Sequence, residues 1–395
     1  MRWKMLFKIG LTIIIFVAVY LYYSLNQQKS STENQPEHLV GDGHDQLHQN
    51  DQLKNNEVDL EAVKEKERIE RWQKSIHLSV VACGDRGNET IILLKSAVLF
   101  TSSYFIAHIF AESELQENMK AQLDFWPEEY KSRMEYRIYD ISFPGTKNAE
   151  EWKKLFKPCA SQRLFLPSLL KDVDSLIYVD TDILFLTPLD DLWSFFVKFN
   201  NTQLAAVAPE HEDKATGWYN RFARHPYYGE LGVNSGVMLM NLTRLRHTTW
   251  LSSMIDYHRE YKLKITWGDQ DLINIYFHYH PDQLYVFNCE WNFRPDHCMY
   301  MSVCRGADRD GAYVLHGSRR VMHNDKQPAF KAVYDAFKNH EFSSTIKYHL
   351  IENIKRNMKK VADTNCGRVG HIFVKQIEQF VKKVDDTEQK KINPR

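Results

Sequence analysis

The sequence predicts an α/β domain with a mixed, mostly parallel β-sheet flanked by helices, preceded by a transmembrane helix and a polar stem. Three observations support this prediction. Short apolar runs typical of buried strands alternate with helical segments after residue 75. A long apolar run lies near the N-terminus, and polar residues dominate between this run and residue 75. The chain has 395 residues, 43% of them hydrophobic, which suffices for a large core.

The N-terminal apolar run covers residues 5–25 and has about the length that a helix needs to cross a bilayer. Arg2 and Lys4 precede it and only Lys29 follows closely, so the positive-inside rule places residues 1–4 in the cytosol. The alternative is a cleaved signal peptide, but the run is long and ends in tyrosines rather than small residues. We therefore expect a single-pass type II membrane protein of the endoplasmic reticulum or Golgi, with the folded part in the lumen.

Three further segments follow the expected anchor. Residues 26–75 are rich in Asn, Gln, Asp, Glu and Lys, and they contain too few apolar side chains to form a core, which is typical of a stem. Residues 76–345 contain the alternating pattern and are predicted to form the α/β domain. Residues 346–395 are predicted to be a Lys-rich helical extension.

Sequons and cysteines agree with a lumenal location. Disulfides form in this compartment; Cys289, Cys298 and Cys304 cluster in one stretch and are expected to pair. Cys83 follows an apolar run, and a buried free thiol is its alternative state. Three N-x-T sequons are candidate glycosylation sites. They lie at Asn88, Asn200 and Asn241.

Charge and cysteine spacing exclude two classes of protein. The 51 basic and 51 acidic side chains cancel, whereas nucleic-acid binders usually have a basic surplus. No C-x-x-C pair is present, which argues against a zinc ribbon or a thioredoxin-like redox site. We therefore expect no nucleic-acid partner.

The periodicity predicts the order of strands and helices in the folded part. In open α/β sheets, ligands bind at the carboxyl ends of the strands, so polar residues at these ends are the candidates for a functional site. Strands are expected at residues 77–83, 104–110, 134–143, 175–186, 204–208, 236–240, 284–288 and 313–315, and helices at 91–100, 114–125, 150–170 with a break at Pro158, 245–262, 269–280 and from 330 onward.

Asp180 and Asp182 are the central candidates. The chain contains four D-x-D patterns, but only this one lies within an apolar, strand-like run, where unpaired carboxylates are costly to bury. Two carboxylates at this spacing can bind one hard divalent cation. The alternative is a strand end with two solvated aspartates. His316 follows another apolar strand and would complete a metal site, although a lone histidine there is more often a packed or capping residue.

Four other polar groups are candidates, three near expected strand or helix ends and Arg163 on a helix face. The Gly84-Asp85 pair after the first strand can hold a nucleoside, or it can be an ordinary turn. Asn234, before the strand at 236–240, is part of a segment that allows substrate to approach the backbone, or of a turn. Asp269 opens a helix and has an N-cap as its alternative role. The Arg163 guanidinium can offset pyrophosphate charge or pair with a neighbour.

Six segments in this order identify a family. The chain resembles glycosyltransferase family eight, the retaining transferases of GT-A fold that include glycogenin and bacterial galactosyltransferases, over roughly residues 76–335. Within that family, the anchor, the stem, the region around the DTD motif and the run HGSRRVMHNDKQPAFKAVYDAF most resemble the glucoside xylosyltransferases. The six segments are VVACGD, SQRLFLPSLL, LIYVDTDILFL, VNSGVMLMNL, GDQDLIN and VLHG.

The resemblance implies a role for each candidate residue. A manganese ion is expected at Asp180, Asp182 and His316, because manganese suits an oxygen-rich site with one imidazole. Many members hold the diphosphate with a Gly-x-x-Lys-Pro-Trp-like run after the metal histidine. This chain has Gly317-Ser-Arg-Arg instead, so the sequence does not identify which basic residue contacts the diphosphate. The implied sets are Asp180, Asp182 and His316 for the metal, Ala82 and Asp85 for uridine, Arg163 for the sugar nucleotide, Asn234, Asp269 and Gln270 around the transferred sugar, and Arg319, Arg320 or Lys326 for the diphosphate.

The implied activity is transfer of xylose from UDP-xylose, in α-1,3 linkage, to O-linked β-glucose on epidermal-growth-factor-like (EGF-like) repeats of Notch-type proteins. Because Gln270 is a poor nucleophile, same-face attack is the expected route to retention of configuration. The alternatives within the class are glucose, galactose or glucuronate donors, or another acceptor. The alternative outside the class is a catalytically silent, membrane-anchored interaction protein. The presence of both aspartates of the D-x-D pair argues against this alternative.

Overall fold

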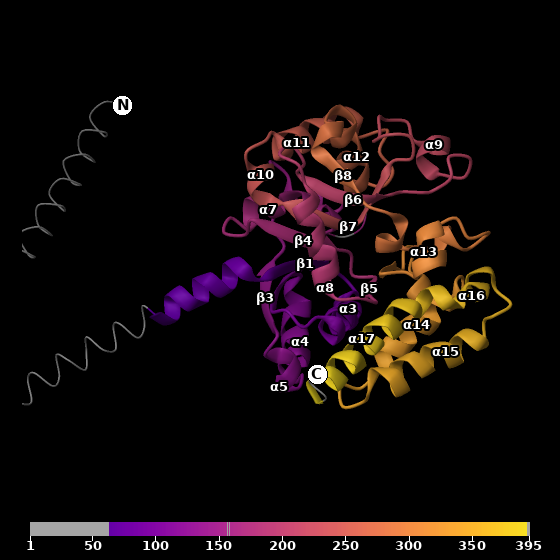
Figure 1. Cartoon of the computed structure of the whole chain (residues 1–395). Coiled ribbons are helices and arrows are strands. Elements are labelled where there is room, and N and C mark those ends of the chain that lie inside the picture. The colour runs from indigo at the N-terminus through magenta and orange to yellow at the C-terminus, as the bar shows by residue number, and fades with distance from the viewer. Residues whose placement is uncertain (1–62, 156, 158, 393–395) are drawn as a thin grey trace, which may run out of the picture. The chain divides into compact units, whose positions relative to one another are not determined.

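The computed structural model describes residues 63–155, 157 and 159–392 (Figure 1). The predicted cytoplasmic tail, membrane helix and most of the predicted stem lie outside the described residues. Within the described ranges, no helix has the length and apolar character needed to cross a membrane. Residues 63–74 are helical, and the chain from Glu70 onward forms one compact unit.

A seven-stranded mixed sheet forms the centre of this unit. Its order is β3-β2-β1-β4-β7-β6-β8, and the first four strands of that order are mutually parallel. Strand β7 runs antiparallel to both of its neighbours, and β6 is parallel to β8. The predicted mixed, mostly parallel sheet is thus confirmed. The strands are β1 (Ile76–Ala82), β2 (Phe105–Ala111), β3 (Met134–Asp140), β4 (Ser175–Val179), β6 (Ala205–Pro209), β7 (Val233–Asn241) and β8 (Leu284–Val286).

The strand predicted at 175–186 is wrong in one respect, because it is two strands in two sheets. After β4 the chain turns, and β5 (Ile183–Phe185) pairs antiparallel with β9 (Val314–His316) in a separate two-stranded sheet. Ile183 lies opposite His316 in this pairing. The turn that contains the two aspartates is therefore brought next to a histidine far along the chain.

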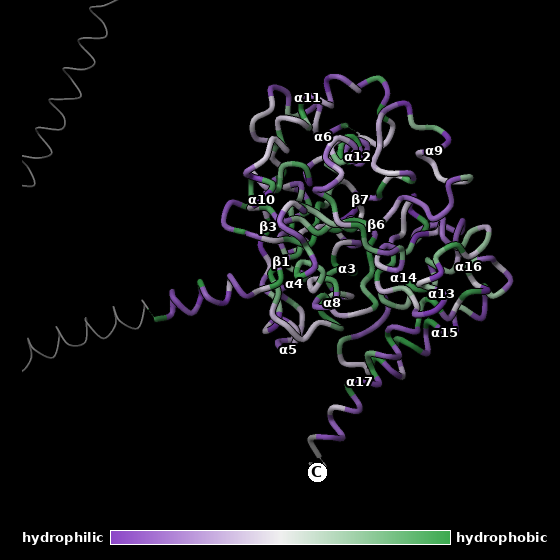
Figure 2. The backbone as a smooth tube through the Cα atoms, turned by 45° about the horizontal axis from the view of Figure 1, so that its top comes forward, coloured by the Kyte–Doolittle hydropathy of each residue, from purple (hydrophilic) through white to green (hydrophobic). Residues whose placement is uncertain are grey.

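Both faces of the large sheet are covered, which explains why its central strands are apolar at every position. All seven residues of β1 are buried. Leu78 and Val80 belong to the hydrophobic core that includes α3 (Gly87–Phe100), whereas Val81 belongs to the core that includes α12 (Asp269–Tyr279). The hydrophobic residues accordingly concentrate in the interior of the backbone trace in Figure 2.

Most predicted helices are present, with shifted ends. The segment predicted as helical at 150–170, with a break at Pro158, is divided into three short elements. The remaining α-helices are α4 (Ser113–Asp124), α5 (Glu128–Lys131), α6 (Ala149–Lys153), α7 (Leu166–Leu169), α8 (Leu189–Trp193), α9 (Trp218–Phe222), α10 (Leu242–Arg246), α11 (Trp250–Tyr261), α13 (Arg305–Asp310), α14 (Pro328–Asn339), α15 (Glu352–Lys359), α16 (Asn365–Arg368) and α17 (Lys375–Ile392).

Short helices of other kinds complete the structure. One of them, η7, is a π-helix, and the others are 3₁₀ helices. They are η1 (Ala160–Phe165), η2 (Ser194–Lys198), η3 (Pro281–Gln283), η4 (Cys289–Asn292), η5 (Pro295–His297), η6 (Val321–His323), η7 (Ile346–Ile351) and η8 (Gly370–Phe373).

The C-terminal helices pack together beside the two-stranded sheet (Figure 1). Side chains of α14, α15 and α17 share one hydrophobic core with Leu184 of β5 and Leu315 of β9. The Cys298–Cys366 disulfide joins residues 346–395 to the preceding domain. The predicted division at residue 345 stays a prediction, but these helices share a core with the strand that carries His316.

All six cysteines are paired. Cys289 bonds Cys304 within the predicted cluster, whereas Cys298 bonds Cys366, outside it. The alternative of a free thiol at Cys83 is wrong, because this residue bonds Cys159. Three disulfides are typical of the secretory pathway.

A buried polar chain crosses three neighbouring strands. The Trp72 carbonyl accepts a hydrogen bond from His77 Nε2 at 3.1 Å, so His77 Nδ1 is unprotonated and accepts from His108 Nε2 at 2.9 Å. His108 Nδ1 in turn accepts from the Tyr139 hydroxyl at 3.0 Å. The Trp72 indole also donates to the Asp172 carbonyl. The predicted stem boundary at residue 75 stays untested, although Trp72 already packs on the folded unit.

We expect these histidines to make the fold sensitive to acid. The pKa of His77 is lowered to about 4 and that of His108 to about 3, mainly by burial, and the nearby Arg137 charge contributes to both shifts. Below pH 6.5 the unfolded chain binds protons that the folded chain excludes, so stability present above pH 6.5 is lost as the pH falls towards 4. Each pKa unit corresponds to about 1.4 kcal/mol, so the loss should amount to several kcal/mol.

Urea denaturation of the wild type between pH 7.5 and 4.5 measures this loss. His108→Gln should reduce the slope of stability against pH, because one buried titrating group is removed. The exposed His247→Gln is the control and should leave the slope unchanged. Equal slopes in His108→Gln and the wild type would contradict the assignment.

Candidate active site

A cavity of about 660 Å³ lies at the carboxyl ends of β1 and β4, where the strand-end rule places a site. The loop after β1, with Asp85, forms one wall of this cavity. The turn after β4 and the beginning of α12 contribute Asp180 and Asp269. The structure thus brings most of the predicted site residues to one cavity.

Asp180, Asp182 and His316 converge at this cavity. Their ligand atoms all lie within 4.8 Å of one another. His316 Nε2 lies 3.4 Å from Asp182 Oδ1 and 3.6 Å from Asp180 Oδ2. Asp182 and His316 are buried, while the Asp180 side chain keeps 28% of its surface exposed. The residues that the sequence identified as candidate metal ligands therefore lie together.

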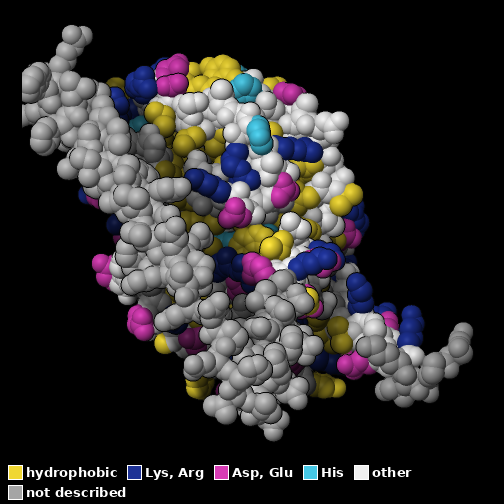
Figure 3. Space-filling model, turned by 90° about the vertical axis from the view of Figure 1, so that its left-hand side faces the viewer, with side chains coloured by type: hydrophobic (Ala, Val, Ile, Leu, Met, Phe, Trp, Pro, Cys, Tyr) yellow, Lys and Arg dark blue, Asp and Glu magenta, His cyan; other side chains and the backbone are white. Residues whose placement is uncertain are grey.

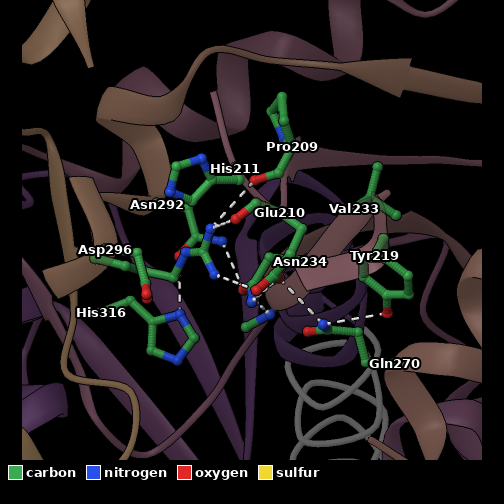
Figure 4. Close-up of polar contacts among 12 residues, drawn as sticks. Pro209, Glu210, His211, Tyr219, Val233, Asn234, Gln270, Asn292, Asp296 and His316 are labelled. Carbon is green, nitrogen blue, oxygen red and sulfur yellow. Dashed lines mark hydrogen bonds and ion pairs between the residues drawn. The ribbon is translucent and has the colours of Figure 1, made fainter. Parts of the chain in front are cut away.

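A chain of side chains fixes the protonation of His316 (Figure 4). The Glu210 carboxylate accepts from Asn234 Nδ2 at 2.8 Å, so the Asn234 oxygen faces the other way. That oxygen accepts from the Gly236 N–H and from Asn292 Nδ2. The remaining Asn292 oxygen lies 2.9 Å from His316 Nδ1, which must therefore carry the proton. Nε2 is then the ring nitrogen that faces the two aspartates.

This arrangement fits a bound divalent cation. Two carboxylate oxygens and His316 Nε2 face one another, and a cation between them would offset the repulsion between the two carboxylates. Two carboxylates and one neutral imidazole are a common donor set for divalent metals. The hydrogen bond from Nδ1 to Asn292 is the kind of contact that orients a metal-binding histidine.

Gly236 makes room for the imidazole. A Cβ at this position would lie 2.2 Å from His316 Cε1, so any other residue would displace the ring. His316 therefore approaches the Gly236 backbone closely, and the approach of a substrate to the segment with Asn234 stays a prediction.

Arg163 is fully engaged within the protein. Its Nη2 donates to Asp180 Oδ1 at 2.7 Å, and its Nε pairs with Asp269 Oδ2 at 2.7 Å. Its Nη1 donates to the Ser235 carbonyl at 2.6 Å, and its guanidinium lies 4.4 Å from the Tyr178 ring centroid. Of the two roles left open by the sequence, pairing with neighbours is thus observed, and contact with the sugar nucleotide stays a prediction.

Asp269 and Gln270 begin α12, and both side chains are buried. The N-cap is Gly268, so the alternative role of Asp269 as an N-cap is wrong. Burial raises the pKa of Asp269 to about 6, although the Arg163 charge opposes this shift. Gln270 accepts from the Ser235 N–H at 3.2 Å and donates to Glu210 at 3.1 Å.

The loop after His316 brings arginines to the cavity. Arg319 pairs with Asp296 at 2.6 Å, and Arg320 pairs with Asp85. Ser318, Arg319 and Arg320 all have positive φ angles, between 34° and 62°, which is a strained conformation for three successive residues with side chains. Such strain is typical of functional loops.

Two predicted contacts are not at the cavity. Lys326 is exposed and absent from the cavity wall, which favours the two arginines for the diphosphate. The Ala82 side chain is fully buried in β1 and does not line the cavity, whereas Asp85 does. The uridine contact expected at Ala82 therefore has no support from its side chain.

Sequence reasoning missed the residues that support this site. Glu210 and Arg294 form a buried ion pair with a distance of 2.8 Å. Glu210 directly follows the strand Ala205–Pro209, so the strand-end rule applied to the predicted strand at 204–208 would have found it. Asn292 lies in η4, in a stretch without strand or helix periodicity, and no sequence signal indicated it.

The three sequons differ in exposure. Asn88 and Asn200 are exposed, whereas Asn241 is partly buried and caps α10 through its side-chain oxygen. The Asn241 side-chain nitrogen, to which a glycan would attach, lies 3.5 Å from Ser175 Oγ. Glycosylation at all three stays a prediction.

Comparison with known proteins decides the family. The model of glycosyl transferase family 8 matches residues 77–316, from β1 to His316. The chain belongs to glycosyl transferase family 8. It is therefore a glycosyltransferase, as the sequence motifs predicted, and members of this family are typically metal-dependent.

Its relatives are named for one activity. The chain is 53% identical to glucoside xylosyltransferase 1 of Gallus gallus, over 78% of this chain and 73% of that protein. It is 52% identical to glucoside xylosyltransferase 1 of Mus musculus, over 81% of each. It is also 52% identical to glucoside xylosyltransferase 2 of Xenopus laevis, over 79% of this chain and 76% of that protein. The predicted similarity to glucoside xylosyltransferases is confirmed.

Solved structures support the fold. The crystal structure of the galactosyltransferase LgtC, in complex with donor and acceptor sugar analogues, covers 69% of this chain and 99% of that chain, with a TM-score of 0.53 at 17% identity. This likeness assigns a GT-A-like α/β fold to the chain.

Proposed function

We propose that the protein transfers xylose from UDP-xylose, with retention and in α-1,3 linkage, to O-linked β-glucose on EGF-like repeats of Notch-type proteins. Relatives with half of their residues identical carry the name glucoside xylosyltransferase. The observation that carries the catalytic part is the convergence of Asp180, Asp182 and His316 at the wall of a cavity of about 660 Å³.

The three converging side chains are the proposed ligands of Mn²⁺. A bound Mn²⁺ would supply positive charge where negative charge grows on the leaving diphosphate. Asp180 and Asp182 provide carboxylate oxygens, and His316 provides Nε2, while its Nδ1–H donates to Asn292. Arg163 fixes the orientation of Asp180 by donating to its other oxygen.

Arg319 and Arg320 are the proposed partners of the diphosphate. Both line the cavity, and both now pair with carboxylates, those of Asp296 and Asp85. These two ion pairs are exposed on the arginine side, so they cost little to exchange for charge-assisted hydrogen bonds to phosphate oxygens. Asp85 is then available for the nucleoside.

The transferred sugar is proposed to lie beside Asn234, Asp269 and Gln270. The Gln270 side chain is held at both ends, by Ser235 and Glu210, and a neutral amide is a poor nucleophile. Same-face attack is therefore the favoured route to retention, with the leaving phosphate accepting the proton of the acceptor hydroxyl. The side chains of the pocket serve to orient the sugar and exclude water.

The proposed location is the lumen of the endoplasmic reticulum or Golgi. Three disulfides among the described residues support an oxidising compartment. The anchor at residues 5–25, with residues 1–4 in the cytosol, rests on the sequence pattern. On the described part of the face in Figure 3, basic and acidic side chains are interspersed.

A donor panel tests the proposed substrates. The purified full-length chain, in detergent with Mn²⁺, is incubated with UDP-xylose, UDP-glucose, UDP-galactose or UDP-glucuronate and an EGF-like repeat with or without O-linked glucose. We expect the glucosylated repeat to gain a single pentose that α-xylosidase removes, and the bare repeat to gain nothing. Mass spectrometry of the repeat measures both.

The alternatives predict different products. Equal rates with UDP-glucose and UDP-xylose would contradict the donor assignment and leave the family assignment intact. No UDP release with any donor in the presence of Mn²⁺ would favour the catalytically silent interaction protein.

A further inference from the structure

Glu89 is a buried carboxylate outside the proposed ligand set. It lies in the first turn of α3, and its side chain is 2% exposed. Oε2 accepts from Thr181 Oγ1 at 2.7 Å and from Arg86 Nη1 at 2.5 Å. Oε1 lies 2.6 Å from His323 Nε2. Both carboxylate oxygens are therefore engaged by side chains from outside α3.

The three partners of Glu89 come from the three loops that form the site. Thr181 is the residue between the two aspartates. Arg86 belongs to the loop after β1 and lines the cavity. His323 ends η6, directly after the strained loop with Arg319 and Arg320. One carboxylate thus joins the metal turn, the nucleoside loop and the arginine loop.

The contact with Thr181 constrains the two aspartates directly. Thr181 bonds Glu89, while its neighbours on both sides meet His316, so the turn is held from opposite sides. The turn between β4 and β5 has only three residues, and its middle residue, Thr181, is the one that donates to Glu89. A buried carboxylate keeps such donors in place strongly, because losing a partner leaves its charge unpaired.

We propose that Glu89 is a positioning residue for the metal site, acting through the Thr181 hydroxyl. This inference rests on the proposed metal-binding role of Asp180, Asp182 and His316. Glu89 touches neither the ligand atoms nor the cavity that holds the donor. It sets the orientation of the aspartates and keeps the arginine loop, through His323, in register with them.

Mn²⁺ binding to the full-length chain, without nucleotide or acceptor, tests this proposal by calorimetry. Thr181→Val keeps the shape of the side chain and removes the hydroxyl donor, and we expect Mn²⁺ affinity to fall about 10- to 100-fold, as for other residues that orient metal ligands. Thr181→Ser keeps the hydroxyl and should bind Mn²⁺ as the wild type does. Glu89→Gln keeps the size, loses the charge and should weaken binding similarly.

Two further variants exclude a general structural effect. Glu290→Gln neutralises another buried glutamate, 5% exposed and near the Cys289–Cys304 disulfide, and should leave Mn²⁺ affinity unchanged. In the double variant of Glu89→Gln and Thr181→Val, Mn²⁺ affinity should be no lower than in the single variant with the lower affinity, because both changes act on the same hydrogen bond. Fully additive losses would show that Glu89 acts independently of Thr181 and would overturn the proposal.

The Thr181 pair keeps the proposal falsifiable even if Glu89→Gln fails to fold. Wild-type affinity in Thr181→Val, or an equal loss in Thr181→Ser, would overturn it. A failure of the proposed function gives a different result from a failure of this inference. A wild type that binds Mn²⁺ but transfers no xylose would refute the proposed substrate and leave the positioning role of Glu89 standing.

Discussion

Replacing Asp182 or Asp180 with asparagine is expected to reduce transfer by more than ~100-fold in a chain that still folds. Asparagine keeps the size of the side chain but removes the charge that a divalent cation requires. In the absence of metal, both variants should still fold, but Asp180→Asn should have a lower melting temperature, because Arg163 loses one of its two carboxylate partners. Manganese-dependent UDP release and melting temperature, measured for each variant, check both parts.

The matched control is another D-x-D pattern of the chain. Asp172 is exposed and lies outside the cavity wall, so Asp172→Asn should keep full activity. If Asp180 and Asp182 merely ended a strand, their substitution would lower stability and leave the response to manganese unchanged. Folded variants with wild-type UDP release would exclude a metal role for this turn.

The second large effect is expected at Arg163. Arg163→Ala leaves Asp180 and Asp269 without their buried counter-ion, and removing one partner of a buried ion pair typically costs about 3–5 kcal/mol. The melting temperature should therefore fall strongly, and activity should fall because Asp180 loses its orientation. Denaturant unfolding measures the change in the free energy of unfolding.

A second substitution separates the cause. Asp269→Asn in the Arg163→Ala background should restore part of the lost stability, because one unpaired carboxylate is removed. The exposed pair of Arg259 and Asp256 provides the control, and Arg259→Ala should change the free energy of unfolding by less than about 1 kcal/mol. A small loss in Arg163→Ala, or no recovery in the double variant, would contradict the buried pairing.

Much of the fold follows from sequence periodicity, because the central strands are covered on both faces and are apolar throughout. The exception is the run at 175–186, where β4 and β5 read as one strand. Periodicity reports burial of side chains but not the partner strand, so it does not reveal that the chain changes sheets between them. That change places Asp180 and Asp182 beside His316.

The candidate site was predictable where polar residues end apolar strands. Asp180, Asp182 and His316 meet this condition, whereas Asn234 lies at the beginning of β7. The supporting residue Asn292 was not, because it lies in a 3₁₀ segment and acts through hydrogen bonds made by its side-chain amide. The Cys83–Cys159 bond escaped prediction for a similar reason, since the two cysteines are 76 residues apart and disulfide connectivity does not follow from spacing.

The metal site is tested most directly by pulsed electron paramagnetic resonance of Mn²⁺ bound to the full-length chain. If His316 Nε2 is a ligand, the wild-type spectrum shows coupling to an imidazole nitrogen. His316→Ala, at a Mn²⁺ concentration high enough to fill its weakened site, should lose this coupling while the ion stays bound. Nitrogen coupling that persists in His316→Ala, or is absent from the wild type, would contradict the account.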